Sequence, residues 1–268
     1  MTNALELRKL HQFFNQGTVN ERHVLKGIDL KLAPGEFVAV IGGNGAGKST
    51  LLNSIAGSLP VDQGQVKIED EDVTYETVAK RARLIGRVFQ DPQMGTAPLL
   101  TVEENLSLAL LRGQKRNCWS FGVKKKQRQF LQEQLALLNL GLEDRLSAEI
   151  GLLSGGQRQA ITLLMATLQN PALLLLDEHT AALDPQTSQI VMTLTAQLVA
   201  EKQLTTLMIT HNMADALKFG NRLIMLDQGQ IAIDVAGDEK AQLTVPDLLA
   251  LFKHKSGQDL TDDRVLLS

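Results

Sequence analysis

The chain has 268 residues, of which 44% are hydrophobic and 21% are charged, as in an ordinary globular protein with a substantial core. Its formal net charge of −3 argues against nucleic acid as the main partner, and its single cysteine, Cys118, excludes an internal disulfide and favours a reducing compartment. No apolar run approaches the roughly 18 residues of a membrane span, and charged side chains interrupt the N-terminus, so we expect a soluble, cytoplasmic protein.

Apolar patterning predicts an α/β chain whose middle part is purely helical. Alternating or continuous apolar runs predict strands at 4–10, 25–32, 37–41, 65–68, 84–89, 173–176, 204–210, 222–226 and 230–235. Capping residues and helical periodicity predict helices at 51–56, 77–83, 102–110, 124–140, 155–168, 185–202, 212–219 and 244–252. Since no strand is predicted between about residues 91 and 169, this stretch is expected to form a separate helical lobe.

Two helices of this lobe carry specific local signals. Thr101 and Glu104 have the spacing of a capping box at a helix start. The helix predicted at 124–140 begins with basic residues and has an apolar stripe that predicts its buried face. The residues of this stripe are Phe130, Leu131, Leu135 and Leu138.

A glycine-rich segment follows the predicted strand at 37–41 and precedes a helix. Its sequence, Gly42-Gly43-Asn44-Gly45-Ala46-Gly47-Lys48-Ser49-Thr50, matches G-x-x-x-x-G-K-[ST] in the strand–loop–helix context that this motif requires. The glycines let backbone N–H groups surround a phosphate chain. Lys48 offers positive charge to the β- and γ-phosphates, and the Ser49 hydroxyl suits Mg²⁺. The segment therefore predicts a nucleoside triphosphate site.

A second signal is the pair Asp177-Glu178 at the end of the apolar run 173–176. In open α/β sheets, ligands gather at the carboxyl ends of parallel strands. Asp177 is placed there to hold Mg²⁺ beside the phosphate loop. Glu178 points elsewhere and is free to accept a proton from an attacking water molecule.

A third signal is the segment Leu153-Ser154-Gly155-Gly156-Gln157, which opens a predicted helix. Ser154 is an N-cap candidate, and the two glycines expose backbone amides at a helix start, an arrangement that binds anions. A chain with one complete phosphate loop has little need of a second phosphate site of its own. We therefore expect this segment to act in trans, on the γ-phosphate held by another subunit.

Together these motifs resemble those of ATP-binding cassette (ABC) ATPases, in order and approximate spacing, from about residue 5 to residue 234. The resemblance implies a P-loop NTPase with a RecA-like core, an antiparallel β-subdomain and an inserted α-helical subdomain. It implies one domain over residues 1–268, with the core and β-subdomain at 1–90 and 170–235, the helical subdomain at 91–169, and a C-terminal helix and polar tail at 236–268. It also implies a head-to-tail dimer with two ATP molecules at its interface.

The resemblance assigns roles to further residues. Phe14 looks like the aromatic residue that stacks on adenine, and Phe13 is the alternative. Gln90 resembles the glutamine that reaches Mg²⁺ and the attacking water. Asp184, which also caps the helix predicted at 185–202, resembles an aspartate that communicates across the dimer. His211 resembles the histidine that contacts the γ-phosphate.

The chain departs from the family after the catalytic glutamate, where His179 and Ala181 replace the usual proline and serine. The family places this position away from the phosphates, so His179 is not expected to be catalytic. The segment around it resembles a subgroup of bacterial importer ATPases associated with tryptophan, tyrosine or uncharacterised substrates. The helical lobe also carries a basic cluster with two nearby aromatic residues, for which a solvated helix face and contact with lipid or a membrane subunit both stay open. Its residues are Arg112, Lys115, Arg116, Lys124, Lys125, Lys126 and Arg128, with Trp119 and Phe121.

The main hypothesis is an ATP-hydrolysing subunit that energises solute import through a separate permease, with ATP and Mg²⁺ as cofactors. The partners implied are a second cassette, identical or paired, the permease subunits and indirectly a substrate-binding protein, which would hold the chain at the inner face of the cell membrane. The alternatives are a soluble ABC ATPase that acts on ribosomes or DNA, and an exporter subunit. The chain has neither the second cassette nor the long coiled coil that are usual in ribosome- and chromosome-acting relatives.

Overall fold

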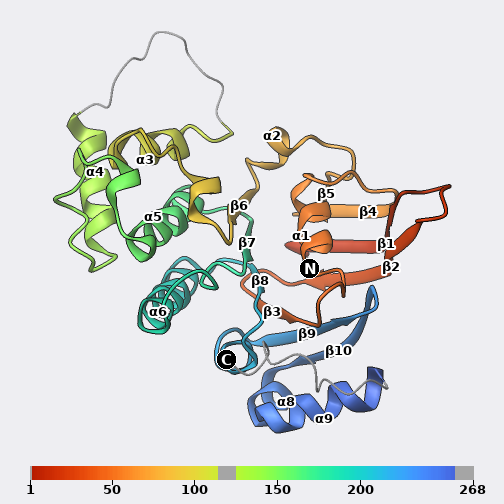
Figure 1. The fold of residues 1–268 in the computed structure, drawn as a ribbon. Helices are drawn as coiled ribbons and strands as arrows, with labels where there is room; N and C mark the ends of the chain where they lie inside the picture. Colours follow the sequence, from red (N-terminus) through yellow and green to blue (C-terminus); the bar gives the residue numbers. More distant parts are fainter. Residues whose placement is uncertain (1, 114–124, 257–268) are drawn as a thin grey trace.

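Two β-sheets lie beside a group of helices in the computed structural model, which describes residues 2–113 and 125–256 (Figure 1). The antiparallel sheet has the order β2-β1-β4-β5. Its strands are β1 (Leu5–Phe14), β2 (Arg22–Leu32), β4 (Gln63–Ile68) and β5 (Glu71–Asp72). The second sheet has the order β10-β9-β3-β8-β7-β6, in which all neighbours are parallel except β10 and β9. Its strands are β3 (Phe37–Ile41), β6 (Ile85–Val88), β7 (Leu173–Asp177), β8 (Thr206–Ile209), β9 (Arg222–Asp227) and β10 (Gln230–Ala236).

The central strands of the second sheet are apolar on both faces because both faces are covered. In β7, Leu173 and Leu175 pack into the cluster formed with the antiparallel sheet, whereas Leu174 and Leu176 pack into the cluster that contains the helical part of the chain. All four leucines are fully buried. This two-sided burial explains why the strand reads as a continuous apolar run and why it ends at its first carboxylate.

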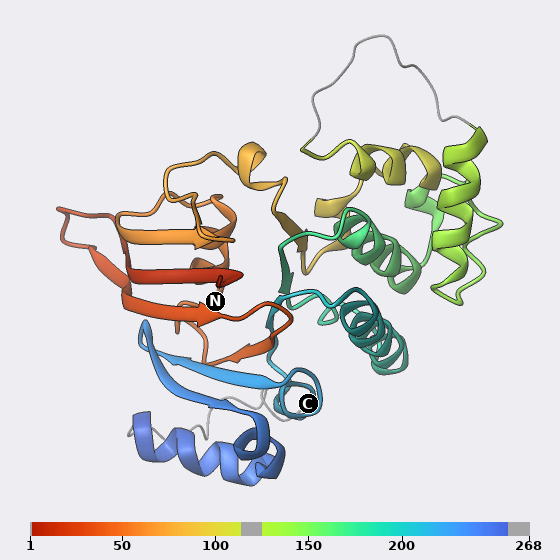
Figure 2. The same cartoon turned by 180° about the vertical axis from the view of Figure 1, so that it is seen from behind.

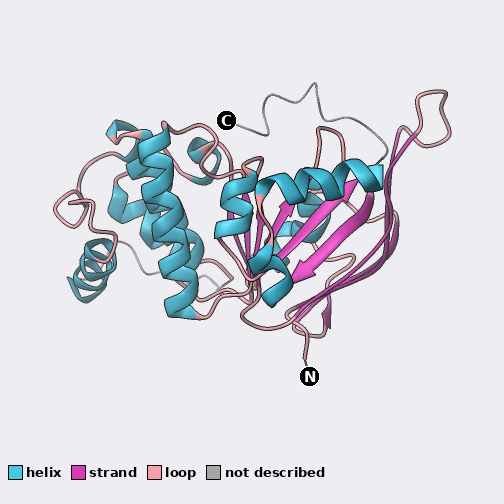
Figure 3. Cartoon of the chain, turned by 90° about the horizontal axis from the view of Figure 1, so that it is seen from below, coloured by secondary structure: helices cyan, strands magenta, loops and turns pink. Residues whose placement is uncertain are grey.

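The segment between β6 and β7 contains helices and no named strand among its described residues. Those between β6 and β7 are η1 (Pro92–Gly95), α3 (Val102–Leu110), α4 (Lys125–Ala136), η2 (Ile150–Leu152) and α5 (Gly155–Thr167). The others are α1 (Lys48–Ala56), α2 (Val78–Arg81), α6 (Pro185–Lys202), α7 (Met213–Lys218), α8 (Gly237–Gln242) and α9 (Val245–Ser256). Seen from behind, α3, α4 and α5 stand apart from the antiparallel sheet (Figure 2). The view from below shows a helical part of the chain beside the part that contains the strands, against which further helices lie (Figure 3). The predicted P-loop α/β architecture with a β-subdomain and an inserted helical part is confirmed.

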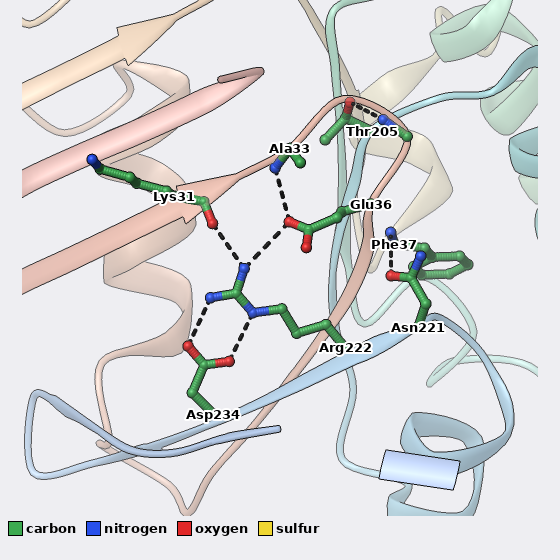
Figure 4. Close-up of polar contacts among 9 residues, drawn as sticks. Lys31, Ala33, Glu36, Phe37, Thr205, Asn221, Arg222 and Asp234 are labelled. Atoms are coloured by element: carbon green, nitrogen blue, oxygen red, sulfur yellow. Dashed lines mark hydrogen bonds and ion pairs between the residues drawn. The ribbon is translucent and has the colours of Figure 1, made fainter. Parts of the chain in front are cut away.

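An arginine at the start of β9 joins the two sheets (Figure 4). Arg222 forms a two-pronged contact with Asp234 of β10, with both N–O distances at 2.7 Å, and its Nη1 donates to the Lys31 carbonyl of β2 at 2.8 Å. Glu36, which precedes β3, lies 3.3 Å from the same guanidinium. The hydrogen bond from Arg222 to Asp234 raises the pKa of this already basic group. The contact fixes the antiparallel sheet beside the strand that feeds the phosphate loop.

Several predicted boundaries are wrong. The strand predicted to end at residue 10 continues to Phe14, because Phe13 and Phe14 pair with His23 and Arg22 of β2. β8 begins at Thr206 and β6 ends at Val88, both shorter than predicted, and the short elements β5 and α8 were not predicted. Phe130 is 39% exposed, whereas the other three residues of its stripe are buried. Helical periodicity alone could not show that the Phe130 side chain is partly exposed to solvent.

The basic cluster of the helical lobe falls only partly within the described residues. Arg112 donates to the Ala166 carbonyl at 3.0 Å, and Arg128 contacts Glu103 and the Ser147 hydroxyl. These two arginines are therefore engaged within the lobe itself. Lys125 and Lys126 are exposed at the start of α4. Cluster positions 115, 116 and 124, together with Cys118, Trp119 and Phe121, lie outside the described residues, as does the tail from residue 257. None of the helices in residues 2–113 and 125–256 combines the length and hydropathy needed to cross a bilayer.

Candidate nucleotide site

The phosphate loop joins β3 to α1 and depends on two of its glycines. A side chain at Gly42 would put its Cβ 2.3 Å from the Leu226 carbonyl oxygen of β9, so only glycine lets the loop pass this close. Gly47 has a φ of 104° and is the N-cap of α1, with no side-chain cap on the helix. The first turn of α1 thus begins at a residue that cannot supply a capping oxygen, which suits a helix start that receives phosphate.

Lys48, the first residue of α1, is buried to 6% exposure. Its ammonium donates to the carbonyl oxygens of Gly42 and Gly43, at 2.7 and 3.1 Å. These two hydrogen bonds hold the Lys48 ammonium at the phosphate loop. A bound phosphate would accept from the same ammonium, in place of these carbonyl oxygens or together with them.

Most of the predicted nucleotide residues line one cleft of about 860 Å³. It is lined by Phe14, Asn44, Gly45, Ala46, Gly47, Lys48, Ser49, Thr50, Glu178 and His211, which were predicted, and by Asn15, Arg22, His23, Val24, Lys26 and Gln228, which were not. The unpredicted set adds three basic or imidazole side chains from β2 to a cleft for a polyanion. No motif marks them, because they reach the loop only through the pairing of β1 with β2 and through the β9–β10 turn.

Glu178 and His211 meet at this cleft. The Glu178 carboxylate lies 2.5 Å from Nε2 of His211, and Glu178 has a φ of 47°, a conformation uncommon for a residue with a side chain. Glu178 thus has a partner in His211 that the sequence did not reveal, and its role as proton acceptor stays a prediction. The contact brings together the two residues predicted from separate strand ends, after β7 and after β8.

Asp177 has a partner that the sequence did not reveal. Arg87 of β6 places Nη2 3.2 Å from Oδ2 of Asp177 and 2.8 Å from Oδ1 of Asn53 on α1. Burial lowers the pKa of Arg87, and the charge of Asp177 opposes that shift. Arg87 and Asp177 share one face of the sheet because Arg87 pairs with Leu175, two residues before Asp177.

The two candidate adenine residues differ in their surroundings. The Phe13 ring stacks on His23, with ring centroids 4.1 Å apart and planes 12° apart. Phe14 is 38% exposed and lines the cleft. An exposed ring at the cleft is the one that a planar base can reach, so the geometry favours Phe14.

The remaining predicted residues do not line this cleft. Ser154 caps α5 with a complete capping box, in which its hydroxyl accepts from the Gln157 amide and the Gln157 side chain accepts from the Ser154 amide, both at 3.3 Å. Asp184 caps α6 and accepts from the Thr187 amide at 3.0 Å, a contact that lowers the pKa of Asp184. Gln90 is exposed just after β6. Ser154–Gln157 thus do not line the cleft of their own chain, and their predicted action in trans on the phosphate of another subunit stays a prediction.

His179 is buried behind the catalytic turn. Its exposure is 2%, Nε2 lies 3.0 Å from the Thr195 hydroxyl, and burial lowers its pKa to about 4. The side chain thus lies inside the fold.

The residues at the loop fit a magnesium ion. Ser49, Gln90 and Asp177 carry hydroxyl, amide and carboxylate oxygens, the hard donors that Mg²⁺ prefers, and the Ser49 hydroxyl lines the cleft. In residues 2–113 and 125–256, no group of three or more His, Cys, Asp or Glu side chains is placed to hold a metal ion. A site here would take most of its remaining ligands from phosphate and water, as is usual for Mg²⁺.

The parallel sheet, the phosphate loop after β3 and the carboxylates at the end of β7 define a P-loop nucleoside triphosphatase. A family model described as "ABC transporter" matches residues 25–181. A tyrosine transport ATP-binding protein of Clostridioides difficile is 43% identical over 93% of this chain and 99% of its own length. A thiamine import ATP-binding protein, ThiQ of Photorhabdus laumondii, is 34% identical over 87% of this chain and 94% of its own length. The chain belongs to the ABC transporter family, as an ATP-binding subunit that hydrolyses ATP.

Solved structures agree with this assignment. A dimeric ATP-binding cassette in a post-hydrolysis state, bound to ADP and Pi, has a TM-score of 0.73 and 30% identity, over 87% of this chain and 98% of its own. Another cassette of an ABC transporter, in its ADP conformation, has a TM-score of 0.77 and 26% identity, over 94% and 99% of the two chains. The transporter hypothesis thus holds over a role on ribosomes or DNA.

Proposed function

We propose that this chain is the ATPase of an importer, which closes onto a second cassette around ATP and so drives a membrane permease. The observation that carries the proposal is the meeting of Glu178 and His211, 2.5 Å apart, at a cleft formed by a complete phosphate loop. A general base, a phosphate contact and a phosphate cradle then lie in one place.

In the bound state, the amides of residues 44–50 surround the phosphates while Lys48 turns from its carbonyl acceptors toward the β- and γ-phosphates. Phe14 stacks on the adenine. Ser49, Asp177 and Gln90 would hold Mg²⁺, which supplies charge neutralisation for the transferring phosphoryl group. Arg22, His23 and Lys26 add positive charge along the same cleft.

Hydrolysis requires a positioned water molecule. Glu178 accepts its proton, and His211, which holds the carboxylate in place, contacts the γ-phosphate. Gly155 and Gly156 of the partner cassette would contribute amides at the start of α5, with Ser154, and Asp184 would transmit closure across the interface. Ser154–Gln157 do not line the cleft of their own chain. This observation supports a head-to-tail arrangement, in which they act on the ATP of the partner cassette.

The same proposal includes the transported solute and the location. An amino acid of the tyrosine type is supported by the relative at 43% identity, together with the sequence resemblance around Glu178. The permease would receive this solute from a substrate-binding protein and would hold the cassette at the inner face of the membrane. Uptake of labelled tyrosine and of thiamine by the reconstituted complex compares two solutes of relatives; uptake of thiamine alone would overturn this part.

Replacement of Glu178 by glutamine tests the reaction. Glu178→Gln removes the base but keeps the side-chain length, so ATP binding and dimer formation should persist while steady-state hydrolysis falls by about 10²–10⁴. The exposed Glu201 of α6 provides a matched control, and Glu201→Gln should leave the rate unchanged. Undiminished turnover in folded Glu178→Gln protein would rule out Glu178 as the base.

A further inference from the structure

Arg87 forms an ion pair with Asp177. Asp177 is a candidate magnesium ligand, whereas Arg87 has no assigned role. Their side chains are 14% and 18% exposed, so the pair is largely shielded from water. Asp177 accepts from the guanidinium through Oδ2, which lies 3.2 Å from Nη2 of Arg87. Its other oxygen is not used by this pair, so the carboxylate can still face a metal-bound water.

Arg87 is itself held from three sides. Nη2 donates to Asn53 of α1, and Nη1 donates to the Ser58 hydroxyl just after that helix, at 2.8 and 3.2 Å. The guanidinium also lies 4.5 Å from the centroid of the Phe89 ring, in cation–π geometry. Its Nε is buried without a hydrogen-bond partner among the described residues. A side chain fixed in this way does not swing out readily when Asp177 changes its partner.

A fixed positive charge beside Asp177 has a definite electrostatic sign. In the absence of metal, the guanidinium offsets the cost of a poorly solvated carboxylate. When a divalent cation approaches the same carboxylate, the two positive charges repel each other, in surroundings where water screens them little. Arg87 should therefore stabilise the metal-free site and weaken the binding of metal.

We propose that Arg87 is a positioning residue that acts as a counter-cation for Asp177 and sets the magnesium affinity of the nucleotide site. This inference rests on the proposed role of Asp177 at the metal. The same guanidinium lies against Phe89, the residue before Gln90, so the metal site and the start of the segment at Gln90 share one side chain. Lower metal affinity would favour departure of magnesium with the products after hydrolysis.

The test measures binding and not turnover. The dissociation constant of a fluorescent, non-hydrolysable ATP analogue is measured in EDTA and across a magnesium titration. Arg87→Met should lower the magnesium concentration for half-maximal tightening by about 3- to 10-fold, because the competing charge is gone. Arg87→Lys, which keeps the charge but loses the fork to Asn53, should remain within about twofold of the unchanged protein.

Two backgrounds separate the possible failures. Asp177→Asn protein lacks the carboxylate for which Arg87 and the metal compete, so Arg87→Met should change the magnesium response less there, because only the direct repulsion between Arg87 and the metal remains. If the unchanged protein shows no magnesium response, the proposed metal site itself is wrong. If it responds but folded Arg87→Met protein has the same or a weaker response, only the inference about Arg87 is overturned. Should Arg87→Met fail to fold, Arg87→Gln, which can still donate to Asn53, makes the same comparison.

Discussion

Two helix starts in this chain have the same type of sequence, glycines beside a small hydroxyl residue, but different local structures. At α1 the N-cap is Gly47, with no side-chain cap. At α5 the N-cap is Ser154, whose hydroxyl and Gln157 partner form a complete capping box. The first helix start is open to an anion in the isolated chain, whereas the second already satisfies two of its first amides.

The two helix starts also differ in the groups that surround them. α1 lies at the carboxyl edge of the sheet with Glu178 and His211 nearby, so a phosphate placed there meets a reacting group. α5 begins on the helical part, with the amides of Gly155 and Gly156 left outside its capping box. An anion that reaches them must come from another molecule. The comparison therefore separates a preformed nucleotide cradle at α1 from a capped helix start at α5, to which the second cassette of the proposed dimer would bring its phosphate.

The largest effect expected at the two helix starts distinguishes the role of Ser154 as a cap from its role on phosphate. Ser154→Ala should lower steady-state ATP hydrolysis by about 10- to 100-fold, because one donor to the transferring phosphoryl group is lost. It should also destabilise the fold by about 1 kcal/mol through the lost cap. ATP hydrolysis, ATP affinity and thermal unfolding are measured together, and ATP affinity of the monomer should not change.

Thr101→Ala is the matched control for this substitution. Thr101 forms the same capping box with Glu104 at the start of α3, away from the nucleotide cleft. It should cost about the same stability, near 1 kcal/mol, and leave hydrolysis unchanged. Equal losses of hydrolysis in the two variants would mean that Ser154 acts only as a cap.

A smaller effect tests the packing behind the second helix start. A Cβ at Gly156 would lie 2.1 Å from Cγ2 of Thr187 on α6, whereas a Cβ at Gly155 would lie 3.4 Å from Leu183. Gly156→Ala should therefore destabilise the protein by about 1–3 kcal/mol, the usual cost of overpacking. Gly155→Ala should cost less.

Thermal or urea unfolding measures both glycine variants. Adding Thr187→Ser, which removes the clashing methyl group, should restore much of the stability of Gly156→Ala. If the two glycine variants unfold alike, the close contact between α5 and α6 does not fix the position of this helix start.

The smallest effect near neutral pH concerns His179. Its contribution to the pH dependence of stability has to be measured before the helix-start variants are compared at acid pH. Its pKa of about 4 lies below the ordinary value of 6.5, so the unfolded chain binds the proton more readily. The stability it contributes is fully present above pH 6.5 and falls as the pH decreases toward 4. The loss should reach about 1 kcal/mol at pH 5.5 and about 3 kcal/mol at pH 4.

Unfolding free energies measured from pH 7.5 to 4 would show this loss. His179→Gln places an amide near Thr195 without a titrating group, and it should flatten the profile in that window. An unchanged profile in the variant would show that other groups cause the acid sensitivity.

Local signals in the sequence were the most reliable. Thr101, Ser154 and Asp184 were predicted as caps, and all three accept the expected backbone hydrogen bonds. A cap depends on three or four neighbouring residues, so its geometry is written in a short stretch. The same holds for the phosphate loop, in which spacing and flanking elements define the turn.

Strand ends and cross-strand partners could not be predicted from such stretches. β1 reaches Phe14 because β2 offers Arg22 as a pairing partner, and Arg87 reaches Asp177 because β6 and β7 pair in one particular register. The contact between Glu178 and His211 likewise depends on β7 lying beside β8. Each depends on segments far apart in the chain.

The sequence by itself determined that this protein has a phosphate loop, a carboxylate pair after a buried strand and a second capped helix start, since each is encoded by consecutive residues. The tertiary structure decided which side chains meet at that loop: His211 on Glu178, Arg87 on Asp177, and Phe14 at the rim of the cleft. The reason is physical. Hydrogen bonds of caps and turns are local, whereas the register of parallel strands is set by burial on both faces of a sheet assembled from distant segments.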